Sequence, residues 1–240
     1  MVVVSDTMRV EIWSDVVCPW CYIGKRHLEE ALAGFEHRDE VEIEYRSFEL
    51  DPSAPQVPVE TTVESLAKKF GTDVAGARRL MTRADGPAAA AGLTFRHADT
   101  PHARTVDAHR LLHLAKAAGL QLELKEALLA AYFGRGESMG DHAVLRRVAV
   151  ETGLDPDRVD QVLTTDEYAD AVEADVAQAR AYGAGGVPFF VVDAKYGVSG
   201  AQPAEVFAQL LDRAWVDRQP ALEPVGGAGA NACGPDGCAI

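Results

Sequence analysis

The amino-acid sequence predicts an α/β protein in which a small open β-sheet is interrupted by a long all-helical segment. Strand-like patterns occur only towards the two ends of the chain, at residues 9–13, 41–50 and 187–199. Residues 60–182, between them, carry helix start signals and no strand pattern. With 240 residues, the chain can bury a sizeable core without disulfides to hold it together.

The first fifty residues predict a strand, a helix and a second strand. The short run 9–13 is strand-like, and residues 22–35 form a helix-like stretch. Residues 41–50 alternate apolar and polar side chains over most of their length, which is typical of a strand. The proline-rich segment 51–58 follows and predicts a domain boundary.

The helical segment is predicted from capping patterns. A capping residue precedes Glu by three positions at two places, and it directly precedes proline at two others. These pairs are Thr61 with Glu64, Thr164 with Glu167, Thr100 with Pro101, and Asp155 with Pro156. Strand patterns return at residues 187–193 and 196–199, and residues 202–215 predict a last amphipathic helix.

Composition excludes several classes of function. The formal net charge of −14 argues against a surface for nucleic acid or anionic membranes, which needs clustered Lys and Arg. No apolar run approaches the roughly 18 residues of a membrane span, and the first residues do not resemble a signal peptide. We therefore expect a cytoplasmic protein, where four cysteines indicate catalysis or sensing rather than structural disulfides.

A pair of cysteines stands where the first strand passes into the first helix, in the run Cys18-Pro19-Trp20-Cys21. Two cysteines in one helical turn can close a disulfide with little backbone movement. The helix N-terminus presents unpaired N–H groups and partial positive charge to the first sulfur, which favours the reactive thiolate. Pro19 suits the first turn because its missing N–H has no helical partner there. This arrangement predicts thiol–disulfide exchange.

Several segments together resemble the DsbA family, and most closely its FrnE-like branch, which is related to 2-hydroxychromene-2-carboxylate isomerases. The segments are the Cys18–Cys21 motif, residues 186–190, and the longer stretches 13–24 and 198–203. The resemblance implies a thioredoxin-like fold with a large all-helical insertion domain. Its predicted parts are a thioredoxin-like domain (8–51 plus 183–217), a helical insertion domain (52–182) and a flexible C-terminal tail (218–240).

The resemblance also implies roles for individual residues. Cys18 would be the exposed attacking thiolate, and Cys21 the more buried resolving thiol. Pro188 would follow a cis peptide bond and lie beside the pair, since X-Pro is the only bond at which cis is cheap. The residues expected to contact a bound polypeptide are Pro19, Trp20 and Val187. The implied activity is that of a disulfide oxidoreductase or isomerase acting on protein disulfides and dithiols. Apart from its redox-active disulfide it would need no cofactor, with glutathione or another thiol as a possible electron donor.

A second cysteine pair, Cys233 and Cys238, lies close to the C-terminus. The intervening Pro235-Asp236-Gly237 favours a turn that can bring the two sulfurs together. Some FrnE-like proteins carry a similar pair, so the resemblance implies an auxiliary redox pair that exchanges electrons with Cys18 and Cys21. Two alternatives stay open, namely incidental cysteines in a frayed tail and a metal clip.

Other polar residues have less specific interpretations. Asp15 could move the proton of the resolving thiol, but capping the turn into the cysteine motif is favoured. His27 is interpreted as a helix-face residue. His109 and His113 share one face of a helix, where a role in the core or in lining a groove is favoured over a metal site. The acidic residues from Asp166 to Asp175 predict a solvated helix surface.

Two rival functions remain at this point. The first is a glutathione-assisted isomerase or polyketide-tailoring enzyme acting on an aromatic small molecule. Such isomerases usually lack the second cysteine of the motif, so Cys21 argues against this rival. The second is a holdase or a metal-binding dithiol protein without enzymatic activity. The sequence determines neither the client nor the oligomeric state.

Overall fold

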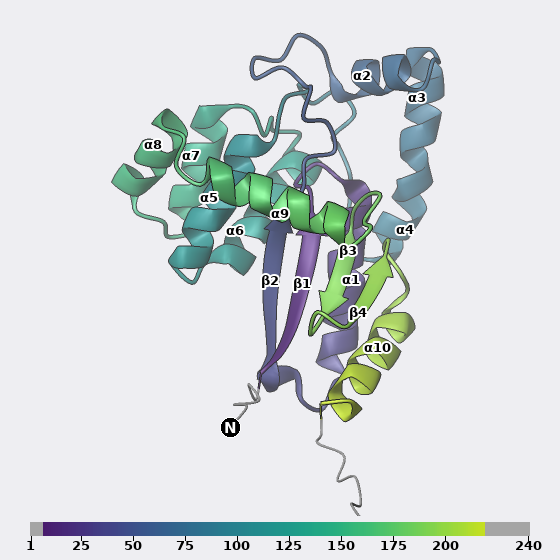
Figure 1. The fold of residues 1–240 in the computed structure, drawn as a ribbon. Helices are drawn as coiled ribbons and strands as arrows, with labels where there is room; N and C mark the ends of the chain where they lie inside the picture. Colours follow the sequence, from purple (N-terminus) through teal and green to yellow (C-terminus); the bar gives the residue numbers. More distant parts are fainter. Residues whose placement is uncertain (1–6, 219–240) are drawn as a thin grey trace, which may run out of the picture.

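The computed structural model describes residues 7–218, which contain a four-stranded mixed sheet with the strand order β2-β1-β3-β4 (Figure 1). β1 pairs in parallel with β2 and antiparallel with β3, and β3 pairs antiparallel with β4. The strands are β1 (Met8–Ser14), β2 (Val41–Ser47), β3 (Phe189–Val192) and β4 (Tyr196–Ser199). The second cysteine pair, Cys233 and Cys238, lies outside the described residues.

Alternate side chains of β1 pack into different layers, because successive strand residues point to opposite faces of a sheet. On one face, Ile12 packs with residues of α1 (Pro19–Ala33) and α10 (Ala204–Val216). On the other face, Trp13 packs against α9 (Ala169–Ala181), which crosses in front of the sheet in Figure 1. The central strand is therefore buried on both sides, and this fixes its C-terminal end in place.

The long segment between β2 and β3 is helical, as predicted. Its helices are α2 (Thr62–Lys69), α3 (Val74–Met81), α4 (Asp85–Ala90), α5 (Val106–Ala117), α6 (Gln121–Leu129), α7 (His142–Glu151), α8 (Pro156–Thr164) and α9. A π-helical turn at Ala130–Gly134 continues α6. In Figure 1, α5 to α8 lie on one side of the molecule, whereas α2, α3 and α4 form a separate arm on the other.

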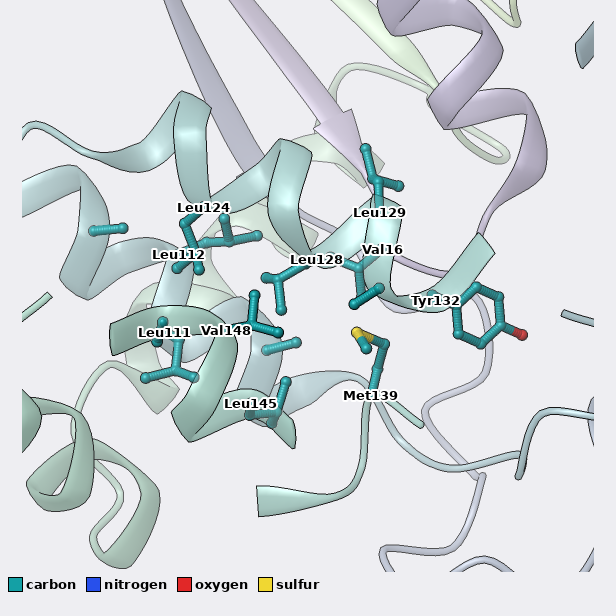
Figure 2. Packing of buried hydrophobic residues seen from close by; sticks show 14 of the residues in the cluster. Val16, Leu111, Leu112, Leu124, Leu128, Leu129, Tyr132, Met139, Leu145 and Val148 are labelled. Atoms are coloured by element: carbon teal, nitrogen blue, oxygen red, sulfur yellow. The ribbon is translucent and has the colours of Figure 1, made fainter. Parts of the chain in front are cut away.

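The core of the helical segment is continuous with the loop that follows β1. Val16, two residues after the end of this strand, lies among Leu128, Leu129 and Met139 (Figure 2). Ile23 of α1 belongs to the same buried cluster. The loop that leads to the two cysteines is therefore held between the sheet and the helices of the insertion. The division of the chain into separate domains stays a prediction.

Two of the four predicted helix starts are confirmed. Thr61 and Glu64 form a capping box at α2, and the Asp155 side chain accepts a hydrogen bond from the Arg158 N–H at the start of α8. The start predicted at Thr164 is wrong, because this residue ends α8. There the Arg110 guanidinium binds the carbonyl oxygens of Val162 and Thr165, a long-range interaction that capping patterns do not encode.

The start predicted at Thr100–Pro101 is also wrong. Pro101 forms an isolated β-bridge with Thr61, and α5 begins only at Val106. The pairing of this loop with the segment before α2 replaces the predicted helical turn.

None of the helices within residues 7–218 is both long and apolar enough to cross a bilayer.

Candidate active site

The two cysteines lie where β1 passes into α1. Cys18 is the N-cap residue, with extended backbone angles (φ −90°, ψ 116°), and Pro19 begins the helix. The backbone N–H groups of Cys21 and Tyr22 donate hydrogen bonds to the carbonyl oxygen of Cys18, over 3.1 and 3.3 Å. The helix therefore starts directly at the motif, as the sequence predicts. Cys18 and Cys21 are both free thiols.

The predicted difference in exposure between the two sulfurs is wrong. Cys18 and Cys21 are each only 3 % exposed. Cys18 is covered because the loop before β3 lies against it, and its thiol donates a hydrogen bond to the carbonyl oxygen of Val187 over 3.6 Å. Trp20, between the cysteines, is 40 % exposed. The motif therefore presents an indole to solvent while both sulfurs lie beneath the surface.

The peptide bond between Val187 and Pro188 is cis, as predicted. The carbonyl oxygen of Val187, in the same loop, lies against the Cys18 thiol. The Pro188 carbonyl oxygen accepts a hydrogen bond from Gly200 N–H over 2.8 Å. Gly200 has a φ of +80°, a conformation that glycine adopts without steric cost. A Cβ atom on Gly24 would lie 3.2 Å from Pro188 and from Phe190, so glycine at this position lets α1 approach the loop closely.

His27 contributes to this arrangement, although the sequence suggested only a helix-face residue. Its Nδ1 atom lies 2.7 Å from the carbonyl oxygen of Gln202, just before α10. The imidazole thus joins α1 to the segment that follows β4, which supports the loop carrying Pro188.

A buried lysine lies beneath the dithiol. Lys125 of α6 is fully buried, and its Nζ atom donates a hydrogen bond to the Ser14 carbonyl oxygen over 3.2 Å. The same ammonium group lies 5.2 Å from the centre of the Tyr45 ring. The sequence analysis missed Lys125. The available signal was its place directly after Leu124 and three residues before Leu128, both of which are fully buried.

Burial and nearby charges shape the acidity of these groups. Burial lowers the pKa of Lys125 to about 8, although attraction to Cys21 and Asp15 opposes this change. For Cys21, burial raises the pKa, but hydrogen bonding to Cys18 and attraction to Lys125 outweigh burial and lower it. Hydrogen bonding to Cys21, together with burial, raises the pKa of Cys18 well above its ordinary value. The two thiols therefore titrate as a pair, which gives up one proton readily and holds the second tightly.

Asp15 is buried next to the motif, but it does not cap the turn into it. Its carboxylate accepts a hydrogen bond from the Leu50 N–H over 2.7 Å and lies 3.3 Å from His109 Nε2. Burial raises the pKa of Asp15, but the hydrogen bond and attraction from His109 outweigh burial and lower it. The carboxylate thus ties the end of β1 to the segment after β2 and to α5.

His109 and His113 have different partners. Whereas His109 faces Asp15, the Nε2 atom of His113 lies 3.1 Å from Ser47 Oγ and 3.2 Å from Asp175 Oδ2. These contacts support the interpretation of both histidines as core residues. Asp175 is only 3 % exposed and accepts a hydrogen bond from the Ser47 N–H, so the prediction of a solvated surface is wrong for this residue.

Replacing Asp15 by asparagine should lower the free energy of unfolding at pH 7 by about 3 kcal/mol, because it leaves a buried partner uncompensated. A carboxyl group with a lowered pKa stabilises the fold above its unfolded pKa of about 3.9, and this stabilisation is lost as the pH falls through the folded pKa. The difference in free energy of unfolding between Asp15→Asn and the wild-type protein should therefore become smaller as the pH falls. Urea denaturation at pH 7 and below pH 4 measures it, with the exposed Asp39→Asn as control. Equal stability of both variants at pH 7 would contradict this role.

Comparison with known proteins places this geometry in a family. The model of the DSBA-like thioredoxin domain matches residues 9–212. The chain belongs to the DSBA-like thioredoxin domain family. The predicted α/β class and thioredoxin-like fold are therefore confirmed, as is the resemblance to the DsbA family.

Three individual proteins match this chain over most of their own length. A crystal structure of a probable DsbA oxidoreductase from Streptomyces coelicolor is 48 % identical, with a TM-score of 0.84 over 97 % of this chain and 99 % of that one. The uncharacterised protein YwbO of Bacillus subtilis is 30 % identical over 175 residues, 68 % of this chain and 76 % of that protein. The cytosolic disulfide reductase DsbM from Pseudomonas aeruginosa, solved with GSH, shares the fold at 15 % identity (TM-score 0.59; 85 % of this chain and 98 % of that one).

Proposed function

We propose that this protein is a thiol–disulfide oxidoreductase whose redox centre is Cys18 and Cys21. The observation that carries the proposal is the placement of both free thiols in the first turn of α1, with the loop of Val187 and Pro188 against Cys18. Membership of the DSBA-like family supports the same chemistry.

In the proposed reaction, the dithiol has already lost one proton, and Cys18 attacks one sulfur of a client disulfide when the remaining proton of the pair lies on Cys21. A mixed disulfide forms, and the other client sulfur leaves as a thiolate that takes up a proton. Cys21, after losing its proton, attacks the Cys18 sulfur. This step releases the second client thiol and leaves a Cys18–Cys21 disulfide, so two electrons have passed to the client. Isomerisation results when a thiol of the client displaces Cys18 before Cys21 attacks.

The surroundings of the two sulfurs suit these steps. Access to Cys18 requires that a client displace the hydrogen bond from its thiol to the Val187 carbonyl oxygen, which places the client beside this loop. Pro19 and the half-exposed Trp20 then supply apolar contact area next to the attacked bond. The buried ammonium of Lys125 stabilises the thiolate that develops at Cys21.

Protein disulfides and dithiols are the proposed clients, and glutathione or another small thiol is the proposed electron donor. The Pseudomonas aeruginosa protein described as a cytosolic disulfide reductase with GSH supports both the donor and a cytoplasmic location. On this proposal the protein is FrnE-like and needs no cofactor other than its own disulfide. In a cytosol kept reducing by thiols, the direction of exchange would be reduction or isomerisation.

A disulfide-containing peptide with a fluorophore quenched across its disulfide tests this function. Glutathione should reduce the peptide far faster in the presence of catalytic amounts of the protein than in their absence. Rates equal to those with the Cys18→Ser variant would contradict the proposal.

The second cysteine pair is proposed as an auxiliary redox pair that passes electrons between the donor and the main dithiol. Replacing both Cys233 and Cys238 by serine should lower turnover with a client, while the Cys18–Cys21 disulfide still forms on oxidation. Steady-state turnover and mass mapping of trapped thiols measure the two effects separately. Unchanged turnover and unchanged thiol pairing would show that the tail cysteines take no part.

A further inference from the structure

A cavity of about 420 Å³ lies beside the cysteine motif, between Trp20 and the helices α2 and α3 of the arm. Its volume falls within the roughly 300–1,000 Å³ of small-molecule sites. Most of its wall is apolar, and Trp20, Leu66, Phe70, Met81, Ala84 and Ala103 contribute to this surface. Neither Cys18 nor Cys21 lines it, so its contents can differ from the substrate of the dithiol.

The imidazole of a buried histidine on the cavity wall has no hydrogen-bond partner among the described residues. His97 is 7 % exposed, and its ring packs 4.8 Å from the ring of Phe133 and 5.6 Å from that of Tyr132. Within residues 7–218, neither ring nitrogen of His97 makes a hydrogen bond. Because burial lowers the pKa of His97 to about 4, the imidazole is neutral at pH 7 and offers one donor and one acceptor. Buried polar groups normally have such partners, and the cavity is where a partner can enter.

Two cations on the same cavity are also unpaired. Lys69, at the end of α2, and Arg83, just before α4, are both exposed and form no ion pair or hydrogen bond with any residue in the described range. The carboxylates lining the cavity, in contrast, are engaged: Asp51 with His102 over 3.1 Å, and Asp15 with His109. In a chain with a net charge of −14, this mouth therefore has positive charge available for an anion.

We propose that the cavity binds a small apolar organic acid. Its apolar body would lie against Trp20 and the side chains of the helical arm. One oxygen of its carboxylate would meet the free ring nitrogen of His97, and the negative charge of the same carboxylate would attract Lys69 and Arg83 at the mouth. This combination of an apolar enclosure with a few convergent polar groups is typical of ligand sites. The proposal does not depend on the redox activity, because no cysteine takes part in the binding.

The test uses 2-naphthoate and its uncharged analogue naphthalene-2-carboxamide as probes, with isothermal titration calorimetry on the full-length reduced protein. We expect 2-naphthoate to bind at one site and the carboxamide to bind at least about fivefold more weakly, as expected for the loss of one favourable charge contact. The single variants Lys69→Gln and Arg83→Gln should each weaken binding of 2-naphthoate by a similar factor and leave binding of the carboxamide unchanged. Arg79→Gln, at an exposed position on α3 that does not line the cavity, is the matched control.

The contribution of His97 is tested separately. His97→Leu should weaken both probes, because both present an oxygen atom to the ring nitrogen. His97→Gln, which keeps a donor and an acceptor, should restore part of the affinity, and this rescue separates hydrogen bonding from packing.

The proposal is overturned if folded wild-type protein binds neither probe, or if Arg79→Gln weakens 2-naphthoate as much as Arg83→Gln does. It is also overturned if Arg83→Gln weakens only the binding of a disulfide-containing client peptide, since the cavity would then serve a polypeptide.

Discussion

Replacing Cys18 by serine should lower the turnover of a disulfide client by at least about 10³-fold, because no second nucleophile stands at this position. The fold should persist, since serine is close in size to cysteine and can keep the hydrogen bond that the Cys18 thiol donates to the Val187 carbonyl oxygen. Client reduction by glutathione measures the loss, and circular dichroism checks the fold.

The matched variant Cys21→Ser should lose turnover at a later step than Cys18→Ser does. Cys18 can still attack a client, but no internal thiol resolves the product, so a mixed disulfide accumulates. Non-reducing gels and mass spectrometry should show a covalent adduct of protein and client that dithiothreitol releases. The Cys18→Ser variant should form no such adduct. Adducts through Cys21 in that variant would reverse the roles assigned to the two cysteines.

Replacing Lys125 by methionine should stabilise the protein while slowing its chemistry. Lys125 has a pKa of about 8 in the folded protein against an ordinary value of 10.5, so the unfolded chain holds the proton more tightly. Between these values stability rises with pH, and below about pH 8 the buried ammonium carries its full cost. The shift corresponds to roughly 3 kcal/mol at most. We therefore expect the variant to gain about 1–3 kcal/mol in free energy of unfolding at pH 7.

The same change should make the dithiol less acidic, because attraction to Lys125 helps to lower the pKa of Cys21. Alkylation of the dithiol by iodoacetamide at pH 7 should slow by about tenfold, because a smaller fraction of the dithiol is then in the reactive thiolate form. Urea denaturation and alkylation rates measured from pH 6 to 10 give both effects. Lys116→Met, on the neighbouring helix α5 and in contact with Glu44 rather than the dithiol, is the control. A Lys125→Met variant that is destabilised and reacts at the wild-type rate would contradict the role of this lysine.

The parts of the site that are local in sequence could be predicted. The Cys18–Cys21 motif and the start of α1 are consecutive, so spacing and helix geometry suffice to place them. The proline after Val187 is a single recognisable position in a family pattern. The arrangement along the chain, in which two strands precede the helical insertion and two follow it, can be read from where the strand and helix patterns begin and end.

The parts that depend on contacts between distant segments could not be predicted. Lys125 lies far from Cys21 in the sequence, and a lysine in a helix ordinarily indicates a solvated position. Asp175 was assigned to the surface for the same reason, but Arg46 and the Ser47 N–H hold it in the interior. The burial of Cys18 likewise depends on a carbonyl oxygen contributed by the loop before β3. Such partners are set by packing, which periodicity and spacing do not encode.

A glutathione redox titration of the purified protein, with acid trapping and mass mapping of all four cysteines, tests the central claim most directly. The account predicts one reversible two-electron transition in which Cys18 and Cys21 pair with each other, and this transition should persist when Cys233 and Cys238 are replaced by serine. If Cys18 and Cys21 never form a reversible disulfide at any ratio of glutathione to its disulfide, the protein is not a dithiol oxidoreductase.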